Sequence, residues 1–108
     1  MITRILQLAL AILCLVGCTA AHYHKRQSDS VNFYLKAPEA HEVAFVSSLD
    51  AFSPQIAKLK EGALWVVTVV VHAEFSYFYI VDGVTHVPEC RFYENDDFGS
   101  RNCIYIPE

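Results

Sequence analysis

Residues 64–87, with the sequence LWVVTVVV-HAE-FSYFYIV-DG-VTHV, decide the fold of this chain. Residues 64–71 form an almost unbroken run of apolar and β-branched side chains, which predicts a central strand rather than an exposed edge strand. Asp82-Gly83 then joins residues 75–81 to residues 84–87 through a two-residue connection that is typical of a β-hairpin. The stretch therefore predicts antiparallel β-structure.

Alternation within this stretch indicates which side chains face the core. Phe75, Tyr77 and Tyr79 fall on one face of their strand, and Phe78 falls on the other. A tyrosine stripe of this kind is typical of one half of a sandwich core, with its hydroxyl groups at the rim. Trp65, between apolar neighbours on the central strand, is also predicted to be a core residue.

Outward from this stretch, four more segments have strand-like patterns: residues 31–35, 42–46, 55–60 and 102–106. A loop at residues 47–54 and a long polar stretch at residues 89–101 separate them. The total is about seven short strands without helical periodicity. This pattern predicts an all-β domain over residues 31–108, with an Ig-like β-sandwich as its architecture.

The N-terminal residues have the pattern of a secretory signal. Met1–Arg4 carries one positive charge, and residues 5–16 form an apolar run that is too short to span a bilayer comfortably. The run ends at Leu15-Val16-Gly17-Cys18, which resembles the lipobox of bacterial lipoproteins. The resemblance implies that residues 1–17 are a signal peptide and that Cys18 is the lipidation site.

An ordinary cleavage after Ala20 or Ala21 is the alternative, and it would discard the lipidation site. With a lipidated cysteine, residues 18–30 are predicted to be a flexible tether, and the two histidines in it, His22 and His24, have no third ligand for a metal in the sequence. The protein is then expected to be lipid-anchored at the cell envelope. Thr19 stands where an aspartate would resemble an inner-membrane retention signal, which favours the outer membrane, facing the periplasm, in a Gram-negative source.

The chain has four cysteines, of which Cys14 lies in the signal segment and Cys18 is the predicted lipid site. The remaining two, Cys90 and Cys103, are predicted to form a disulfide, because an even pair in an exported domain most simply forms one. Such a bond contributes roughly 3 kcal/mol in the chain-entropy model. Two free thiols, or half of a metal site, are the alternatives.

The charge and the motifs exclude several classes of function. The chain has a formal charge of −4, and removal of residues 1–17 makes it one unit more negative by removing Arg4. Nucleic-acid binding is not expected, because it needs a basic surface. No nucleophile elbow, zinc-ligand spacing or phosphate-binding loop is present in the sequence, so neither catalysis nor a cofactor is expected.

Several motifs occur in an order that carries a family resemblance. They are SSLDAF at residues 47–52, GALW at residues 62–65, YFYIVDG at residues 77–83, Pro88, and DDFGSRN at residues 96–102. This order resembles the glycogen-binding module of the AMP-activated protein kinase β subunit and the related isoamylase-type early-set domains of glycogen branching and debranching enzymes. The resemblance covers residues 31–107, and it implies a non-catalytic module that binds α-glucan.

The resemblance also implies a set of carbohydrate-binding residues. Phe52 falls on the first aromatic platform of the family, and Asn102 matches its asparagine, with Phe98 and Ser100 beside it. The second platform of the family falls at Val84 or Thr85, which are not aromatic, and its lysine position is Phe78. These differences imply weak glycan binding.

Two classes of function follow. The first is an envelope lipoprotein that binds glycogen-type α-glucan or another glycan through Phe52, Phe98, Ser100 and Asn102. The second is a protein–protein interaction or structural module of the cell envelope that does not bind glycan, with an envelope protein as its partner. Exposure of Phe52 and Asn102 on a shared groove would favour the first.

Overall fold

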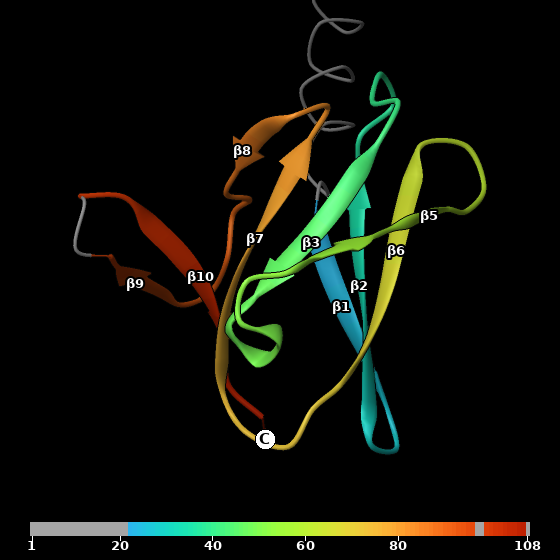
Figure 1. The fold of residues 1–108 in the computed structure, drawn as a ribbon. Coiled ribbons are helices and arrows are strands. Elements are labelled where there is room, and N and C mark those ends of the chain that lie inside the picture. Colours follow the sequence, from blue (N-terminus) through green and yellow to red (C-terminus); the bar gives the residue numbers. More distant parts are fainter. Residues whose placement is uncertain (1–21, 97–98, 108) are drawn as a thin grey trace, which may run out of the picture.

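The computed structural model describes residues 22–96 and 99–107, and these residues form ten strands in two antiparallel sheets that pack face to face (Figure 1). The strands are β1 (His22–Gln27), β2 (Ser30–Lys36), β3 (Val43–Ser47), β4 (Pro54–Ile56), β5 (Lys58–Leu59), β6 (Leu64–Val70), β7 (Phe75–Val81), β8 (Val84–His86), β9 (Tyr93–Asn95) and β10 (Arg101–Tyr105). A single 3-10 turn, η1 (Ser48–Asp50), follows β3. The predicted all-β sandwich is confirmed.

The first sheet has the order β1-β2-β6-β5. Strand β6 pairs with β2 along its whole length and with β5 on its other side, so the apolar run is an internal strand, as predicted. Trp65 is buried in the core, and its indole N–H donates to the carbonyl of Ala37 at 3.1 Å.

The second sheet has the order β4-β3-β7-β10-β9, and β8 also pairs with β7. The β7–β8 turn contains Asp82 and Gly83, both with positive φ, as a hairpin of this length requires. A carboxylate oxygen of Asp82 accepts hydrogen bonds from the backbone N–H groups of His41 and Glu42 at 2.8 Å each. These bonds lower the pKa of Asp82 and fix the hairpin turn against the segment before β3.

Aromatic side chains fill the space between the sheets. Phe33 of β2 is fully buried, and its ring lies 5.0 Å from those of Phe45 and Tyr77 and 5.6 Å from that of Tyr105, measured between centroids. Tyr79 is also buried, as the alternation along β7 predicts. Such ring pairs contribute about 0.5–1.5 kcal/mol each beyond the apolar area that they bury.

The prediction for residues 18–30 is wrong from His22 onward. These residues do not form a flexible tether there, because β1 pairs with β2 over six residues, from the pair His22–Leu35 to the pair Gln27–Ser30. The register places His22, His24 and Arg26 on the side of the strand that faces the other sheet, since their partners on β2 include the buried Leu35 and Phe33. The ordered domain therefore includes β1.

Two further segments differ from their predicted structure. Residues 55–60 do not form one strand, because the chain passes from the second sheet to the first at the buried Ala57, between β4 and β5. Residues 89–101 are not entirely loop, because β9 forms a hairpin with β10 there. The division into β4 and β5, the strand β9 and the strand β1 each add one strand to the predicted seven, which gives ten.

The predicted disulfide between Cys90 and Cys103 is confirmed. The segment around Cys90 is held further by the Tyr93 hydroxyl, which accepts from the backbone N–H of Cys90 at 2.8 Å, and by the backbone N–H of Ile104, which donates to the carbonyl of Phe92 at 2.9 Å. The short segment before β9 is thereby fixed against β10.

The predicted signal peptide and Cys18 lie outside the described residues. Within residues 22–96 and 99–107, no helix has the length and apolar character needed to cross a membrane.

Candidate functional site

Phe52 lies in the loop after η1, on the outer face of the second sheet. Ala51 and Phe52 both have positive φ, and the N–H of Phe52 donates to the carbonyl of Ser47 at 2.9 Å. This tight turn leaves the ring 47% exposed and stacks it on Phe78, with the centroids 6.4 Å apart and the planes at 21°. Phe78 alternates with the buried Tyr77 and Tyr79 on β7 and therefore points away from the core.

Asn102 lies on the same outer face, because it alternates with the buried Cys103 on β10. It is half-buried and lies opposite Glu94 of β9. Ser100, by contrast, lies in the turn at the tip of the β9–β10 hairpin, where its N–H donates to a carboxylate oxygen of Asp96 at 2.9 Å. Figure 1 shows this hairpin extending away from the η1 turn, and Phe98 lies outside the described residues. Two of the four predicted residues therefore share a face.

The outer-face groove, as we name it, lies beside Phe52 and is a shallow hollow of about 390 Å³. Its lining is formed by Ser48, Phe52, Glu74, Phe75, Ser76, Glu94 and Ile104. Asn102 does not line it but neighbours it through the pair with Glu94. The groove thus combines one exposed aromatic ring with two carboxylates and two serine hydroxyls.

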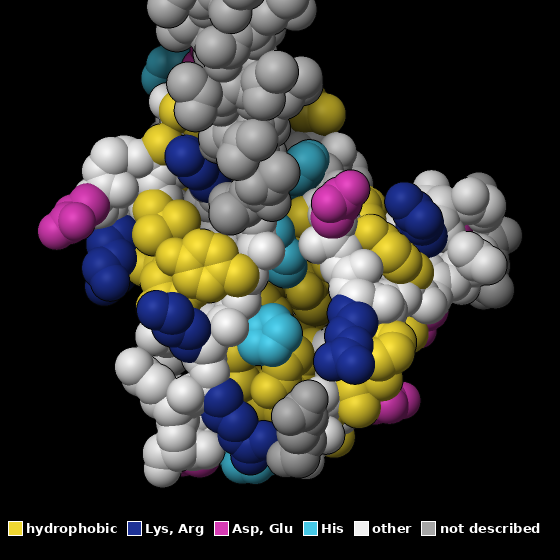
Figure 2. All heavy atoms as spheres, turned by 180° about the vertical axis from the view of Figure 1, so that it is seen from behind, with side chains coloured by type: hydrophobic (Ala, Val, Ile, Leu, Met, Phe, Trp, Pro, Cys, Tyr) yellow, Lys and Arg dark blue, Asp and Glu magenta, His cyan; other side chains and the backbone are white. Residues whose placement is uncertain are grey.

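A second hollow lies at the open edge of the sandwich, between β1 and the segment before β9. We name it the edge groove; its volume is about 300 Å³, and its lining includes His22, His24, Arg91, Phe92, Tyr105 and Ile106. Figure 2 shows histidine side chains over an apolar surface on this side of the molecule, with Lys and Arg side chains and an acidic side chain around them. His22 and His24 fall within the predicted tether, so no function was expected of them.

His22 connects β1 to the second sheet. Its Nε2 atom lies 3.1 Å from the hydroxyl of Tyr79, and its ring also makes a hydrogen bond with the backbone of Glu89. A neutral imidazole has one donor and one acceptor, so we assign Nε2 as the acceptor from Tyr79 and the other nitrogen as the donor to the Glu89 carbonyl. Both ring nitrogens of His22 are therefore used within the protein.

Burial is the main cause of the unusual titration of His22, whose pKa falls to about 4. The hydrogen bond with the Glu89 backbone opposes this effect, and the nearby His24 and His86 add to it. Burial also raises the pKa of the Tyr79 hydroxyl well above its usual value, so this group stays protonated and remains a donor. The histidine is consequently neutral at physiological pH.

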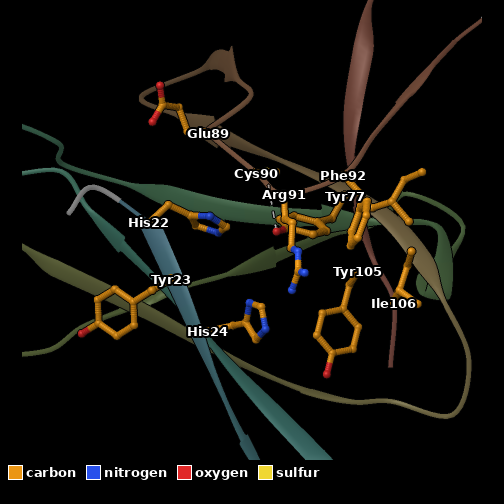
Figure 3. A pocket seen from close by; sticks show the side chains of 11 residues that line it. His22, Tyr23, His24, Tyr77, Glu89, Cys90, Arg91, Phe92, Tyr105 and Ile106 are labelled. Carbon is orange, nitrogen blue, oxygen red and sulfur yellow. Dashed lines mark hydrogen bonds between the residues drawn. The ribbon is translucent and has the colours of Figure 1, made fainter. Parts of the chain in front are cut away.

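His24 and Arg91 face each other across the edge groove. The ring of His24 meets that of Tyr105 edge-on, with the centroids 5.1 Å apart. Figure 3 shows the Arg91 side chain extending into the hollow toward His24 and Tyr105, whereas the Glu89 carboxylate points away from it. The polar chemistry of the edge groove is therefore that of hydrogen-bond donors and positive charge.

Within the described ranges, no group of three or more His, Cys, Asp or Glu residues is arranged to hold a metal ion. The acidic residues near β9 accordingly form no such cluster in that part of the chain. The outer-face groove and the edge groove each combine a hollow with aromatic and polar side chains.

Comparison with known proteins adds no further assignment. A scan against protein-family models finds no match to the chain, and a search of curated proteins also finds none.

Proposed function

We propose that this protein is a non-catalytic lipoprotein of the cell envelope that binds a glycan, weakly, in the outer-face groove. The observation that carries the proposal is the half-exposed ring of Phe52, which lies on Phe78 beside two carboxylates. An exposed aromatic face packs against the apolar face of a sugar ring, and carboxylate oxygens accept hydrogen bonds from sugar hydroxyls. The resemblance to glycogen-binding modules makes α-glucan the first ligand to test.

The weakness follows from the number of platforms. One exposed ring gives one stacking contact, and the second position of the family is occupied by Val84 or Thr85 in β8, which present no ring. Asn102 is placed on the correct face to add a hydrogen bond at the end of the groove toward Glu94. A glycan of several units would then be held mainly at one residue.

The proposed lipid anchor restricts the position of the outer-face groove relative to the membrane. If Cys18 carries the lipid, three residues separate it from the start of β1 at His22, so that four Cα-to-Cα steps join the two. A fully extended chain of this length reaches at most about 14 Å. We therefore propose that the sandwich is held close to the membrane surface, so that its glycan ligands are those of the envelope.

The test is retention of the purified full chain, in non-ionic detergent, on insoluble starch and in glycogen-containing gels. Phe52→Ala and Asn102→Ala remove the ring and the amide from the outer face. Phe92→Ala is the matched control, because Phe92 has a similar exposure, 43%, but lines the edge groove. We expect the wild type and Phe92→Ala to be retained, Phe52→Ala to lose retention, and Asn102→Ala to weaken it.

Absence of retention in a folded, oxidised wild type would overturn α-glucan binding. It would favour the alternative function, a protein-interaction module, for which one observation speaks. The outer face of the second sheet has a row of apolar side chains, in which the 60% exposed Ile56 is followed on successive strands by the buried Ala44 and the partly buried Ile80. Apolar side chains that gather on one face of a sheet are typical of surfaces that meet a partner.

A further inference from the structure

We propose that the edge groove is a second binding site, independent of the outer-face groove, and that its ligand is a carboxylate carried on a six-membered ring. The proposal rests on three features of the described residues. They are the inward-facing side chains of β1, the fixed position of Arg91, and the apolar floor between them.

The first wall is set by the register of β1. His24 pairs with Phe33, and Phe33 faces the core. The ring of His24 is therefore directed toward the second sheet. His22 and Arg26 follow the same alternation, and Arg26 lines an adjoining hollow of about 220 Å³ together with His24. The groove thus continues along the strand.

The second wall is held in place before any ligand binds. Arg91 lies between Cys90, which is bonded to Cys103, and Phe92, whose carbonyl accepts from the backbone of Ile104. Its guanidinium also lies over the ring of Phe92, 5.4 Å from the centroid. A segment fixed in this way loses little conformational entropy on binding, which favours affinity.

The charge of the groove differs from that of the protein. The whole chain has a formal charge of −4, yet Arg91 extends into this hollow and the Glu89 carboxylate at its rim points away (Figure 3). A guanidinium binds a carboxylate through two parallel N–H···O bonds, and a single guanidinium matches the single charge of that group. A phosphate monoester would bring a second negative charge close to Glu89.

The floor and the size of the groove determine the rest of the ligand. Tyr77 and Tyr105 are buried aromatic residues, and Phe92 and Ile106 are exposed at the sides. A volume of about 300 Å³ is at the lower end of the range for small-molecule sites. A flat or chair-shaped six-membered ring fits such a floor. A uronic acid and an aromatic acid are the two classes of compound that carry a carboxylate on such a ring.

The experiment is an NMR titration of the isotope-labelled full chain in detergent. The probes are glucuronate and benzoate, with glucose and benzamide as their uncharged counterparts and with inorganic phosphate as a different anion. The variant is Arg91→Gln, which removes the charge from an exposed position. The matched control is Arg101→Gln, because Arg101 lies over the ring of Tyr93 and lines neither groove.

We expect at least one of the two acids to shift the amide signals of β1 and of residues 89–92, and the uncharged probes to leave them unchanged. The Kd should rise at least about tenfold in Arg91→Gln and stay constant in Arg101→Gln, since a charge-assisted hydrogen bond is lost in the first alone. The acid with the lower Kd identifies the source of the carboxylate as a sugar or an aromatic metabolite.

Three results would overturn the proposal. They are the absence of shifts with both acids, equal affinity of the wild type and Arg91→Gln, and inorganic phosphate that binds as tightly as the acids. None of these results bears on glycan binding at Phe52, because that site has its own variant and its own readout. Signal changes confined to the outer-face groove would also contradict the assignment.

Discussion

The edge groove and the outer-face groove lie on one small sandwich but are built in opposite ways. In the outer-face groove, the exposure of the one aromatic ring depends on a local turn, in which Ala51 and Phe52 adopt positive φ. The edge groove depends on contacts between distant parts of the chain, such as the hydrogen bond between His22 and Tyr79, which are 57 residues apart. The exposed ring of the outer-face groove lies on the surface of the sheet, whereas His22 of the edge groove contacts the buried Tyr79.

The difference predicts how each site responds to perturbation. The two histidines of the edge groove are coupled to global stability, because their neighbours are the buried rings of Phe33, Tyr77 and Tyr105. Phe52 of the outer-face groove, whose ring is half-exposed, can change with little consequence for the core. Three measurements test this difference, and they are given in order of decreasing effect.

Phe33→Ala is expected to have the largest effect. Phe33 is fully buried and contacts His22 and His24 as well as the core rings, so its loss opens a cavity beneath the edge groove. We expect the free energy of unfolding, measured in urea, to fall by about 3–5 kcal/mol. Phe33→Leu is the control for the site, and a loss below 1 kcal/mol in Phe33→Ala would show that the edge groove is not supported by the core.

Acid is expected to have the next largest effect, through His22. Its pKa is about 4 in the folded protein, below the ordinary value of 6.5, so the unfolded chain binds more protons between these values. The stability that the neutral His22 contributes is therefore fully present above pH 6.5 and declines as the pH falls toward 4. The total loss in the free energy of unfolding is roughly 3 kcal/mol. Urea unfolding at a series of pH values measures it.

His22→Gln is the control for this prediction, because it removes the titrating group and keeps a hydrogen-bonding side chain. The difference in stability between the wild type and the variant should depend on pH only within this window. A difference that stays constant from pH 7 to pH 4 would contradict the burial of a neutral His22.

Phe52→Ala is expected to have the smallest effect on stability. The ring is half-exposed and contacts Phe78 on the surface, so we expect the melting temperature to change little and the free energy of unfolding to change by less than about 1 kcal/mol. Loss of glycan retention together with unchanged stability would sharpen the contrast between the two grooves. A large destabilisation would show that this loop supports the fold.

The sequence was sufficient for the parts of the fold that depend on strong local signals. The apolar run at residues 64–71 identified the internal strand β6, and the Asp82-Gly83 pair identified the hairpin of β7 and β8. The remaining even pair of cysteines identified the disulfide. In each case a property of the residues themselves restricts the structure to few solutions.

The strand β1 could not be identified in the same way. Its side chains are all polar or aromatic, so no hydrophobic alternation marks it, and its burial depends on pairing with β2 and on contact with Tyr79. The signal that was present is the two-residue turn Ser28-Asp29, in which Ser28 has positive φ, but this pair is a weaker indicator than Asp-Gly. Recognition of that turn would have placed His22 and His24 on an ordered strand.

The candidate site shows the same division. Phe52 was predicted to lie in a loop and does so, and Asn102 shares its face, because loop position is a local property and the face follows from alternation along a strand. Ser100 lies at a hairpin tip. This position was not predicted, because the polar sequence around Ser100 gave no sign of β9. Tertiary pairing, which the local sequence does not encode, separated it from the groove.

The edge groove also has an order of assembly. Its walls come from β1 and from residues 89–106, so they are separated by most of the described chain. With synthesis at about 5–20 residues per second, β1 exists for roughly 4–15 seconds before β10 follows it. During that interval Tyr77 and Tyr79 of β7 are available to oppose the histidine face of β1, but the groove is complete only after the last strand has paired and the cysteines have been oxidised.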